Sequence, residues 1–285
     1  MRGRARRIAA VKNPIDDDRI ARVNALKWSG GRAARSEECL AGEEPLEIRL
    51  GGRRFTLTMR TPGNDEELVA GFLFAEGFVA SAHELGEIRR VRGSDGKPEL
   101  NIIDVVLEVP ADALRERLKR NFAISSSCGI CGKTSIESIT RRVAPPKGEV
   151  RVKPETILSL AAAMRSEQKI FAATGGLHAA ALFDLAGKIA ALREDVGRHN
   201  AVDKIIGWAL AAGIVPLSDH ILMVSGRLSF ELVQKAAAAG VPILAAVSAP
   251  SSLAVALAEE AGTTIIGFLR DATFNIYTHP ERIAP

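Results

Sequence analysis

The stretch HILMVSGRLSFELVQKAAAAGVPILAAVSAPSSLAVALAEEAGTTIIGFLR, residues 220–270, decides the fold. Short apolar runs rich in β-branched residues alternate in it with alanine-rich segments that are long enough to be helices. Helices placed between such strands indicate right-handed crossovers and a parallel sheet that is covered on both faces. We therefore predict an α/β domain with strands at 221–224, 243–247 and 264–269, helices at 229–239 and 252–261, and a last antiparallel strand near 274–278.

The remainder of the chain adds a smaller region to this unit. We predict a basic, partly disordered arm at 1–40, an α+β region with a cysteine loop at its end at 41–145, and an α/β nucleotide- or cofactor-binding domain at 146–285, joined near Pro145-Pro-Lys-Gly148. The α+β region should hold a hairpin at 44–60, a helix from Asn64 to Glu76 with Glu67 as capping-box partner, strands at 87–91 and 100–109, and a helix at 111–120. The last part should begin with a helix at 156–166, paired strands at 178–185 and 188–192, and a helix capped by Asn200 that runs to Ala212.

Polar turns follow the three strands of the decisive stretch. These turns are Ser225-Gly226-Arg227, Ser248-Ala-Pro-Ser-Ser252 and Arg270-Asp271. Because ligands of open α/β sheets bind beyond the carboxyl ends of the strands, the turns should share one edge. Two of them also open a helix, whose free backbone N–H groups favour anions. We expect a phosphate-bearing ligand at this edge. The alternative is that the serines cap helices and the arginines stay solvated.

The composition is that of a globular protein, with 47% hydrophobic and 25% charged residues. Residues 1–35 hold ten Lys or Arg against three Asp, which accounts for the net charge of +4. Aromatic residues make up only 5%, so we do not expect base stacking or nucleic-acid binding. No apolar run approaches the ~18 residues of a membrane span. Three cysteines are too few for a disulfide framework, which predicts a reduced, cytoplasmic protein.

Cys128 and Cys131 stand in the segment Ser125-Ser-Ser-Cys-Gly-Ile-Cys-Gly-Lys133. A thiol pair at this spacing can bind a metal, exchange disulfides or carry a sulfur atom, and each use needs thiolate character. Structural zinc usually needs four ligands, and no second pair stands at a workable spacing, so we expect no metal site. The zinc-deaminase pattern does not fit, because Ser127 rather than proline precedes Cys128. From these residues alone, sulfur transfer by thiol exchange stays one option among three.

Several motifs that follow one another along the chain resemble one family. They are Ser126-Ser-Cys-Gly-Ile-Cys-Gly132, Gly176-Leu-His-Ala-Ala180, Glu194-Asp-Val-Gly-Arg-His-Asn-Ala-Val-Asp-Lys204, Ser225-Gly-Arg-Leu-Ser229, Gly267-Phe-Leu-Arg270 and Asn275-Ile-Tyr-Thr278. Together they closely resemble the FdhD family, the sulfur carriers that formate dehydrogenase activity requires, over about Glu44–Ile283. The resemblance implies a cytoplasmic homodimer whose core is similar to the cytidine deaminase fold but lacks its zinc chemistry.

The resemblance also implies a reaction and its residues. A cysteine desulfurase would hand persulfide sulfur to Cys128, with Cys131 as the second thiol. This sulfurtransferase would pass the sulfur to a molybdenum bis(guanine dinucleotide) cofactor before insertion into formate dehydrogenase. The family's cofactor segment falls on Phe268, Leu269, Arg270, Asp271, Ala272 and Thr273, at the edge that also carries Ser225, Gly226 and Arg227, and GDP should mimic the end of the cofactor. This chain departs from the family at Asp271-Ala-Thr273, where glycine and basic residues are frequent.

Two questions stay open at this point. Arg198 and His199 either join the cofactor site or are structural, with Arg198 paired to Asp195 and His199 hydrogen-bonded at a helix start. The competing function is a nucleotide-binding protein that uses its thiol pair as a redox or metal switch. Cys39 stands outside every motif, and we expect it to be inert.

Overall fold

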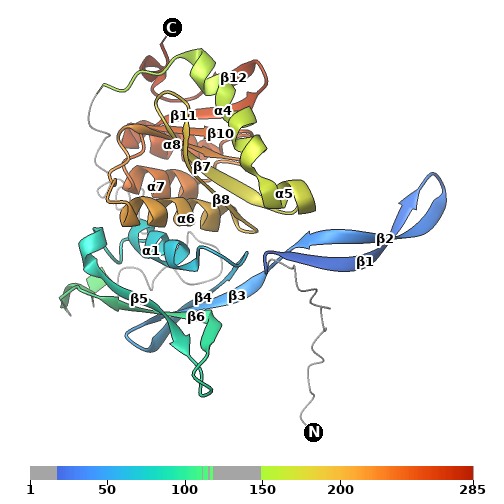
Figure 1. Cartoon of the computed structure of the whole chain (residues 1–285). Coiled ribbons are helices and arrows are strands. Elements are labelled where there is room, and N and C mark those ends of the chain that lie inside the picture. Colours follow the sequence, from blue (N-terminus) through green and yellow to red (C-terminus); the bar gives the residue numbers. More distant parts are fainter. Residues whose placement is uncertain (1–17, 111, 115, 118–148, 285) are drawn as a thin grey trace.

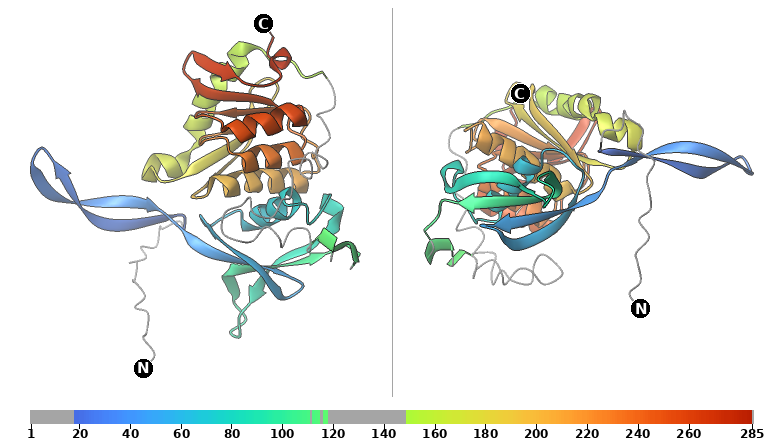
Figure 2. Two further views of the ribbon diagram at one scale, coloured as in Figure 1. Left: turned by 180° about the vertical axis from the view of Figure 1, so that it is seen from behind. Right: turned by 60° about the horizontal axis from the view of Figure 1, so that its bottom comes forward.

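The computed structural model describes residues 18–110, 112–114, 116–117 and 149–284 (Figure 1). Its described strands form sheets of six, four and two strands. The six-stranded sheet and its helices make a large unit, and the four-stranded sheet with helix α1 makes a small unit below it in Figure 1. The two-stranded sheet projects from the side of the molecule as an arm (Figures 1 and 2).

The large unit confirms the predicted parallel strands. β9, β10 and β11 are parallel neighbours, and β12 lies antiparallel on β11 as predicted. β7 pairs antiparallel with β9, and β8 pairs antiparallel with β7, so the sheet is mixed, in the order β12-β11-β10-β9-β7-β8. The bounds are β7 His178–Asp184, β8 Ile189–Asp195, β9 His220–Val224, β10 Ile243–Ala246, β11 Thr264–Arg270 and β12 Thr273–Ile276.

Helices cover both faces of this sheet. On β9, Leu222 and Val224 belong to a hydrophobic cluster shared with α6, α7 and α8, whereas Ile221 and Met223 belong to the cluster shared with α4. This alternation with a period of two is expected for a strand that is buried on both faces. The bounds are α4 Pro154–Glu167, α5 Lys169–Thr174, α6 Arg198–Ala211, α7 Phe230–Ala238 and α8 Ser252–Ala261, and a 3₁₀ turn, η2, spans Pro280–Arg282.

The small unit is a sheet with one helix on its inner face. Its strands lie in the order β4-β3-β6-β5, and Leu46, Ile48 and Val105 of the sheet pack with Leu68 of α1. The predicted strands and helix of this region are confirmed within a few residues. The bounds are β3 Glu44–Leu50, β4 Arg53–Arg60, α1 Asp65–Ala75, η1 Ala82–Glu84, β5 Leu85–Arg92 and β6 Pro98–Leu107. Of the helix predicted at 111–120, residues 112–114 and 116–117 are helical, and the others lie outside the described residues.

The two units meet where α1 crosses α6. A Cβ atom on Gly71 of α1 would lie 1.8 Å from the carbonyl oxygen of Asp203, and one on Gly207 of α6 would lie 1.8 Å from that of Glu67. Only glycine therefore allows the two helix backbones to approach this closely. One hydrophobic cluster runs through both units, so they share a core.

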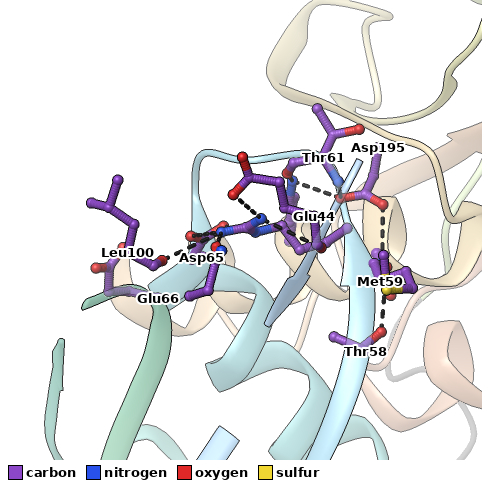
Figure 3. Close-up of polar contacts among 12 residues, drawn as sticks. Glu44, Thr58, Met59, Thr61, Asp65, Glu66, Leu100 and Asp195 are labelled. Atoms are coloured by element: carbon purple, nitrogen blue, oxygen red, sulfur yellow. Dashed lines mark hydrogen bonds and ion pairs between the residues drawn. The ribbon is translucent and has the colours of Figure 1, made fainter. Parts of the chain in front are cut away.

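A buried polar network crosses the same seam (Figure 3). The carboxylate of Asp195 accepts a hydrogen bond from the backbone N–H of Thr61 at 3.2 Å and pairs with Nζ of Lys204 at 2.8 Å. Nζ of Lys204 also donates to the carbonyl oxygen of Thr61 at 2.9 Å. Nearby, Arg60 makes two 3.0 Å hydrogen bonds to the carboxylate of Asp65. These contacts fix the link between β4 and α1 against the large unit.

The predicted arm is regular in its second half. β1 (Ile20–Ser29) and β2 (Arg32–Ala41) pair antiparallel along their full length, while residues 1–17 lie outside the described residues. From Ile20 onward, the arm that was predicted to be partly disordered is therefore a β-ribbon, in which the apolar Leu26 and Trp28 stand at alternate positions of a strand.

Two helix starts differ from prediction. Asn64 has a left-handed φ of 56° and makes no side-chain cap, and Glu67 binds Arg193 of β8 instead of closing a capping box. α6 begins at Arg198, two residues before the predicted cap, and the amide of Asn200 donates to Asp195 at 2.9 Å. Glu67 and Asn200 each bind a residue of the other unit, Arg193 and Met59 respectively, in place of the predicted caps.

Candidate functional site

The carboxyl ends of the parallel strands border a pocket of about 820 Å³. This volume lies within the ~300–1,000 Å³ of small-molecule sites. The strand ends and the segment before β7 form one part of the lining, and α4 and α5 form the other. The lining residues are Ser225, Val247, Leu269, Arg270 and Asp271 from the strand ends, Leu158, Ala161, Ala162, Met164, Arg165, Gln168 and Phe171 from the α4–α5 segment, and Gly175, Gly176, Leu177 and His178.

Charged groups of this pocket stand beside apolar walls. The guanidinium of Arg165 lies over the ring of Phe171, 4.3 Å from its centroid. Arg270 is exposed at the end of β11, where Leu269 next to it is buried. A guanidinium can bind phosphate through two parallel hydrogen bonds, and apolar walls suit a flat ring. The pocket can therefore hold a molecule that combines a ring system with anionic groups.

The pocket brings together part of the predicted cofactor set. Four of the nine predicted residues line it, namely Ser225, Leu269, Arg270 and Asp271. The other five lie outside the lining. Arg227, Phe268, Ala272 and Thr273 are exposed, and Gly226 packs near His178, whose Nδ1 would be 3.4 Å from a Cβ at this position.

His178 is a lining residue that the predicted site did not include. The hydroxyl of Ser225 accepts a hydrogen bond from the backbone N–H of Ala179 at 2.9 Å, which fixes the start of β7 beside the end of β9. Burial lowers the pKa of His178, and the charge of Arg198 lowers it further, while the charge of Asp195 acts in the opposite direction. The motif Gly176–Ala180 in the sequence pointed to His178. Its position beside the pocket could not be predicted, because it depends on the antiparallel pairing of β7 with β9.

The turn from β11 to β12 has an unusual backbone. Phe268 and Asp271 adopt positive φ values of 52° and 41°, and the pairing register shifts between Gly267 and Arg270. Such φ values are uncommon for residues other than glycine, and strained residues concentrate at binding sites. The shift in register coincides with the two charged lining residues, Arg270 and Asp271.

The helix starts at this edge differ from each other. Ser251 caps α8, because its hydroxyl accepts a hydrogen bond from the backbone N–H of Ala254 at 3.2 Å. Ser229 makes no such cap at the start of α7 and instead lies 3.3 Å from Nε2 of His199. For Ser251 the alternative interpretation, in which serines of this edge cap helices, is confirmed.

Arg198 and His199 lie at the start of α6, near a second hollow. This hollow, of about 380 Å³, lies between the two units and is lined by His199, Glu231 and Lys235 among others. Burial lowers the pKa of His199 to about 4, with the charges of Arg198 and Lys235 adding to the effect. Among the described residues Asp195 pairs with Lys204 and no ion pair joins it to Arg198, so the suggested pairing of Arg198 with Asp195 is not formed. The hydrogen bond expected for His199 at a helix start is present.

Known proteins show the same sequence pattern. The model of the FdhD/NarQ family matches residues 41–284. The chain belongs to this family. The segment outside the match contains the basic residues 1–17 and most of the β1–β2 arm.

Relatives of this FdhD/NarQ member are similar over nearly the whole chain. "Sulfur carrier protein FdhD" of Mycolicibacterium paratuberculosis is 50% identical over 267 residues, which covers 92% of this chain and 98% of the relative. The protein of the same name from Sulfolobus acidocaldarius is 44% identical, with 93% and 98% covered. A solved structure from Desulfotalea psychrophila, described as a "putative formate dehydrogenase accessory protein", superposes with a TM-score of 0.72 at 27% identity, over 93% of this chain and 99% of that one.

The predicted thiol pair of this FdhD/NarQ member, Cys128 and Cys131, lies outside the described residues. The chain on either side of it is anchored to the body. Arg117 donates to Glu84 at 2.7 Å and to the carbonyl oxygen of Phe78 at 2.9 Å, and Val152 forms an isolated bridge with Ile283. Cys39 is a free, half-buried thiol on β2.

The described part of this family member contains neither a membrane-spanning helix nor a cluster of metal-binding side chains. None of its helices there is long and apolar enough to cross a bilayer. No group of three or more His, Cys, Asp or Glu side chains among those residues could hold a metal ion.

Proposed function

We propose that this FdhD/NarQ member is a sulfurtransferase. Cys128 accepts sulfur from the persulfide of a cysteine desulfurase, and the sulfur then passes to a molybdenum bis(guanine dinucleotide) cofactor destined for formate dehydrogenase. Membership of the family supports the sulfur-carrying role, because its curated relatives are named sulfur carriers. The pocket at the carboxyl edge is the observation that carries the acceptor side of the proposal.

The residues of the edge pocket fit one end of such an acceptor. Arg270 and Arg165 supply positive charge for a diphosphate, and the ring of Phe171 together with Leu269 supplies flat apolar surface for a base. The volume of about 820 Å³ suits a single nucleotide end, so the pterin portion would extend beyond the pocket. GDP reproduces that end and serves as the probe.

The thiol chemistry requires no oxidant in its first step. The thiolate of Cys128 attacks the outer sulfur of the donor persulfide, which leaves a persulfide on Cys128 and releases the donor cysteine as a thiolate. When the acceptor supplies the electron pair for its new bond to that outer sulfur, the S–S bond breaks and Cys128 is released as the thiolate. Cys131 can assist by exchange with the persulfide, which would release hydrosulfide and leave a disulfide that must be reduced before another cycle.

The donor side predicts a mass increase on one cysteine. Incubation with a cysteine desulfurase and cysteine should add 32 Da (roughly one sulfur atom) to the wild-type protein and to Cys39→Ala, but not to Cys128→Ala, because the thiolate is the nucleophile. Intact-mass spectrometry followed by peptide mapping measures this addition. Sulfur on Cys128→Ala at the wild-type level would assign the carrier role to another residue, and stoichiometric zinc or iron in place of sulfur would favour a metal switch.

The acceptor side predicts a loss of GDP affinity. Arg270→Ala should weaken GDP binding by about 1.5–3 kcal/mol, the usual value of a charge-assisted hydrogen bond, and should leave sulfur loading of Cys128 intact. Lys188→Ala is the matched control, because Lys188 is an exposed cation in the turn between β7 and β8, at the opposite edge of the sheet. Calorimetry with GDP compares the variants. Equal affinity in Arg270→Ala and in the wild type would remove Arg270 from the site.

A further inference from the structure

The second hollow, of about 380 Å³, lies where the two units meet and shares no lining residue with the edge pocket. Three helices face it, and each contributes side chains four positions apart, which lie on one face of a helix. They are Phe72 and Glu76 from the end of α1, His199 and Asp203 from the start of α6, and Glu231 and Lys235 from α7. Figure 1 shows these three helices one above another, with the small sheet below them.

The remaining side of the second hollow is an edge of the small sheet. Thr56, Leu57 and Thr58, three consecutive residues of β4, line it. β4 is the outermost strand of its sheet, and within the described residues no strand pairs with its outer side. The carbonyl oxygen of Met59 accepts a hydrogen bond from the amide of Asn200 at 2.8 Å, so it points away from β3. Because alternate residues of an antiparallel strand turn their N–H and C=O groups to the same side, those of Leu57 point away from β3 as well.

A strand added along β4 would turn alternate side chains into the second hollow. Residues that lie opposite each other on neighbouring strands share a face of the sheet. Thr56 and Thr58 lie opposite Ile48 and Leu46, which are buried against α1, so all four belong to the inner face. The second hollow continues this inner face beyond β4. It is therefore the space that the inward side chains of a fifth strand would fill.

The charges that line the second hollow favour a cation as its occupant. Lys235 is buried and is already bound by two carboxylates of the lining. Glu231 is half-buried, and within the described residues its one ion-pair candidate is His199, at 3.9 Å. Burial lowers the pKa of His199 to about 4, so this imidazole is neutral at neutral pH. The charge of Arg198 reaches Glu231 without forming an ion pair, so the carboxylate is open to a positive charge from outside the chain.

We propose that an extended segment of a partner protein adds to β4 as a fifth strand and places a basic side chain in the second hollow. The free edge of β4 supplies main-chain hydrogen bonds, and the hollow selects the side chain. The aliphatic stem of a lysine or arginine would lie against Leu68 and Phe72, and its charged head would reach Glu231. A nucleic acid does not fit this site, because its phosphates would face that carboxylate.

Short synthetic peptides test the site on the full chain. The probe is fluorescein-Thr-Val-Arg-Val-Thr-amide, in which the arginine and both threonines share one face of a strand. Fluorescence anisotropy should show saturable binding, and the same peptide with glutamate in place of arginine should bind about tenfold more weakly or worse, as expected for loss of a charge-assisted hydrogen bond. Methylation of alternate backbone nitrogens gives two patterns. One of them should abolish binding and the other should not, because alternate N–H groups of an added strand face β4.

Variants of the protein locate the binding. Glu231→Gln should weaken the arginine peptide by about tenfold, whereas Glu260→Gln, at an exposed position of α8, should leave its affinity unchanged. Leu57→Pro should abolish binding, because the ring removes an outward N–H and leaves the ladder with β3 intact, whereas Leu57→Val keeps that N–H and should bind normally. Circular dichroism checks the fold of each variant, and Glu231→Gln with the methylated peptides decides the question if Leu57→Pro does not fold.

Four results would each overturn the proposal. They are a wild type that does not bind the arginine peptide, equal binding of the glutamate peptide, full affinity in Glu231→Gln, and no effect of either methylation pattern. Arginine amide that binds as tightly as the whole peptide would overturn it as well, since the second hollow would then take a small cation rather than a strand.

Discussion

Lys204 and Asp195 are 1% and 0% exposed, and they join the start of α6 to the link between β4 and α1. Two further hydrogen bonds reach Asp195, from the backbone N–H of Gly197 at 2.8 Å and from the amide of Asn200 at 2.9 Å. Both charges have lost their water, so the net stabilisation from the pair is small. Removing one partner is a different matter, because it leaves the other buried charge without its counter-charge.

The contrast between the small net stabilisation from the whole pair and the large cost of removing one partner gives a prediction at the residue scale. Lys204→Met should lower the free energy of unfolding by about 3–5 kcal/mol, because Asp195 remains buried and charged. The double variant Lys204→Met/Asp195→Asn should recover part of that loss. Lys97→Met is the control, since its pair with Asp95 is exposed and should contribute less than ~1 kcal/mol. Urea unfolding followed by circular dichroism measures all three, and a single Lys204 variant as stable as the control would contradict the argument.

At the scale of elements, the close approach of the α1 and α6 backbones leads to a second prediction. Replacing a helical glycine by alanine normally stabilises a helix by about 0.5–1 kcal/mol. Gly71→Ala and Gly207→Ala should do the opposite and cost at least ~1–3 kcal/mol, because the new methyl group would meet the backbone of the facing helix. Ala256→Gly, at an exposed interior position of α8, should show the ordinary propensity with a loss of about 1 kcal/mol. A stability gain in Gly207→Ala would mean that the helices are not so close.

The same scale shows which elements the sequence could predict. α8 was predicted with its observed bounds, and β10 to within one residue, because each is a long or strongly apolar run between clear breaks. The predicted capping partner Glu67 and the predicted cap Asn200 instead bind Arg193 and Met59, which come from far along the chain. Local sequence contains no signal for such partners.

The location of the candidate site could be predicted from the sequence, because the order of strands and helices determines which strand ends meet. Three strand ends on one edge followed from the alternation of strands and helices, and that edge does border a pocket with Arg270 and Ser225 in its lining. The contributions of Arg165 and Phe171 could not be predicted, because they depend on how α4 and α5 pack against the edge. Arg227 follows the same strand as Ser225 but is exposed and lies outside the lining, which adjacency in sequence does not reveal.

At the scale of the whole molecule, the two units should unfold together. One cluster contains Ile48 of the small sheet, Ile206 of α6 and Leu244 of the large sheet, so neither unit has a complete core without the other. A boundary near residue 145 therefore divides the chain in sequence but does not separate two independent cores. Cooperative unfolding follows when contacts of this kind cross the seam.

Trp208 provides a direct measurement of this cooperativity. The chain has two tryptophans, and Trp208 packs against the shared cluster whereas Trp28 lies on the exposed arm. In Trp28→Phe, the fluorescence of Trp208 and the far-UV circular dichroism should give the same urea midpoint at a fixed protein concentration. The calorimetric and van't Hoff enthalpies should agree as well. Separate midpoints would show that the units unfold independently, and a folded fragment of residues 149–285 alone would contradict the shared core, because that fragment would expose to water the surface on which α1 packs.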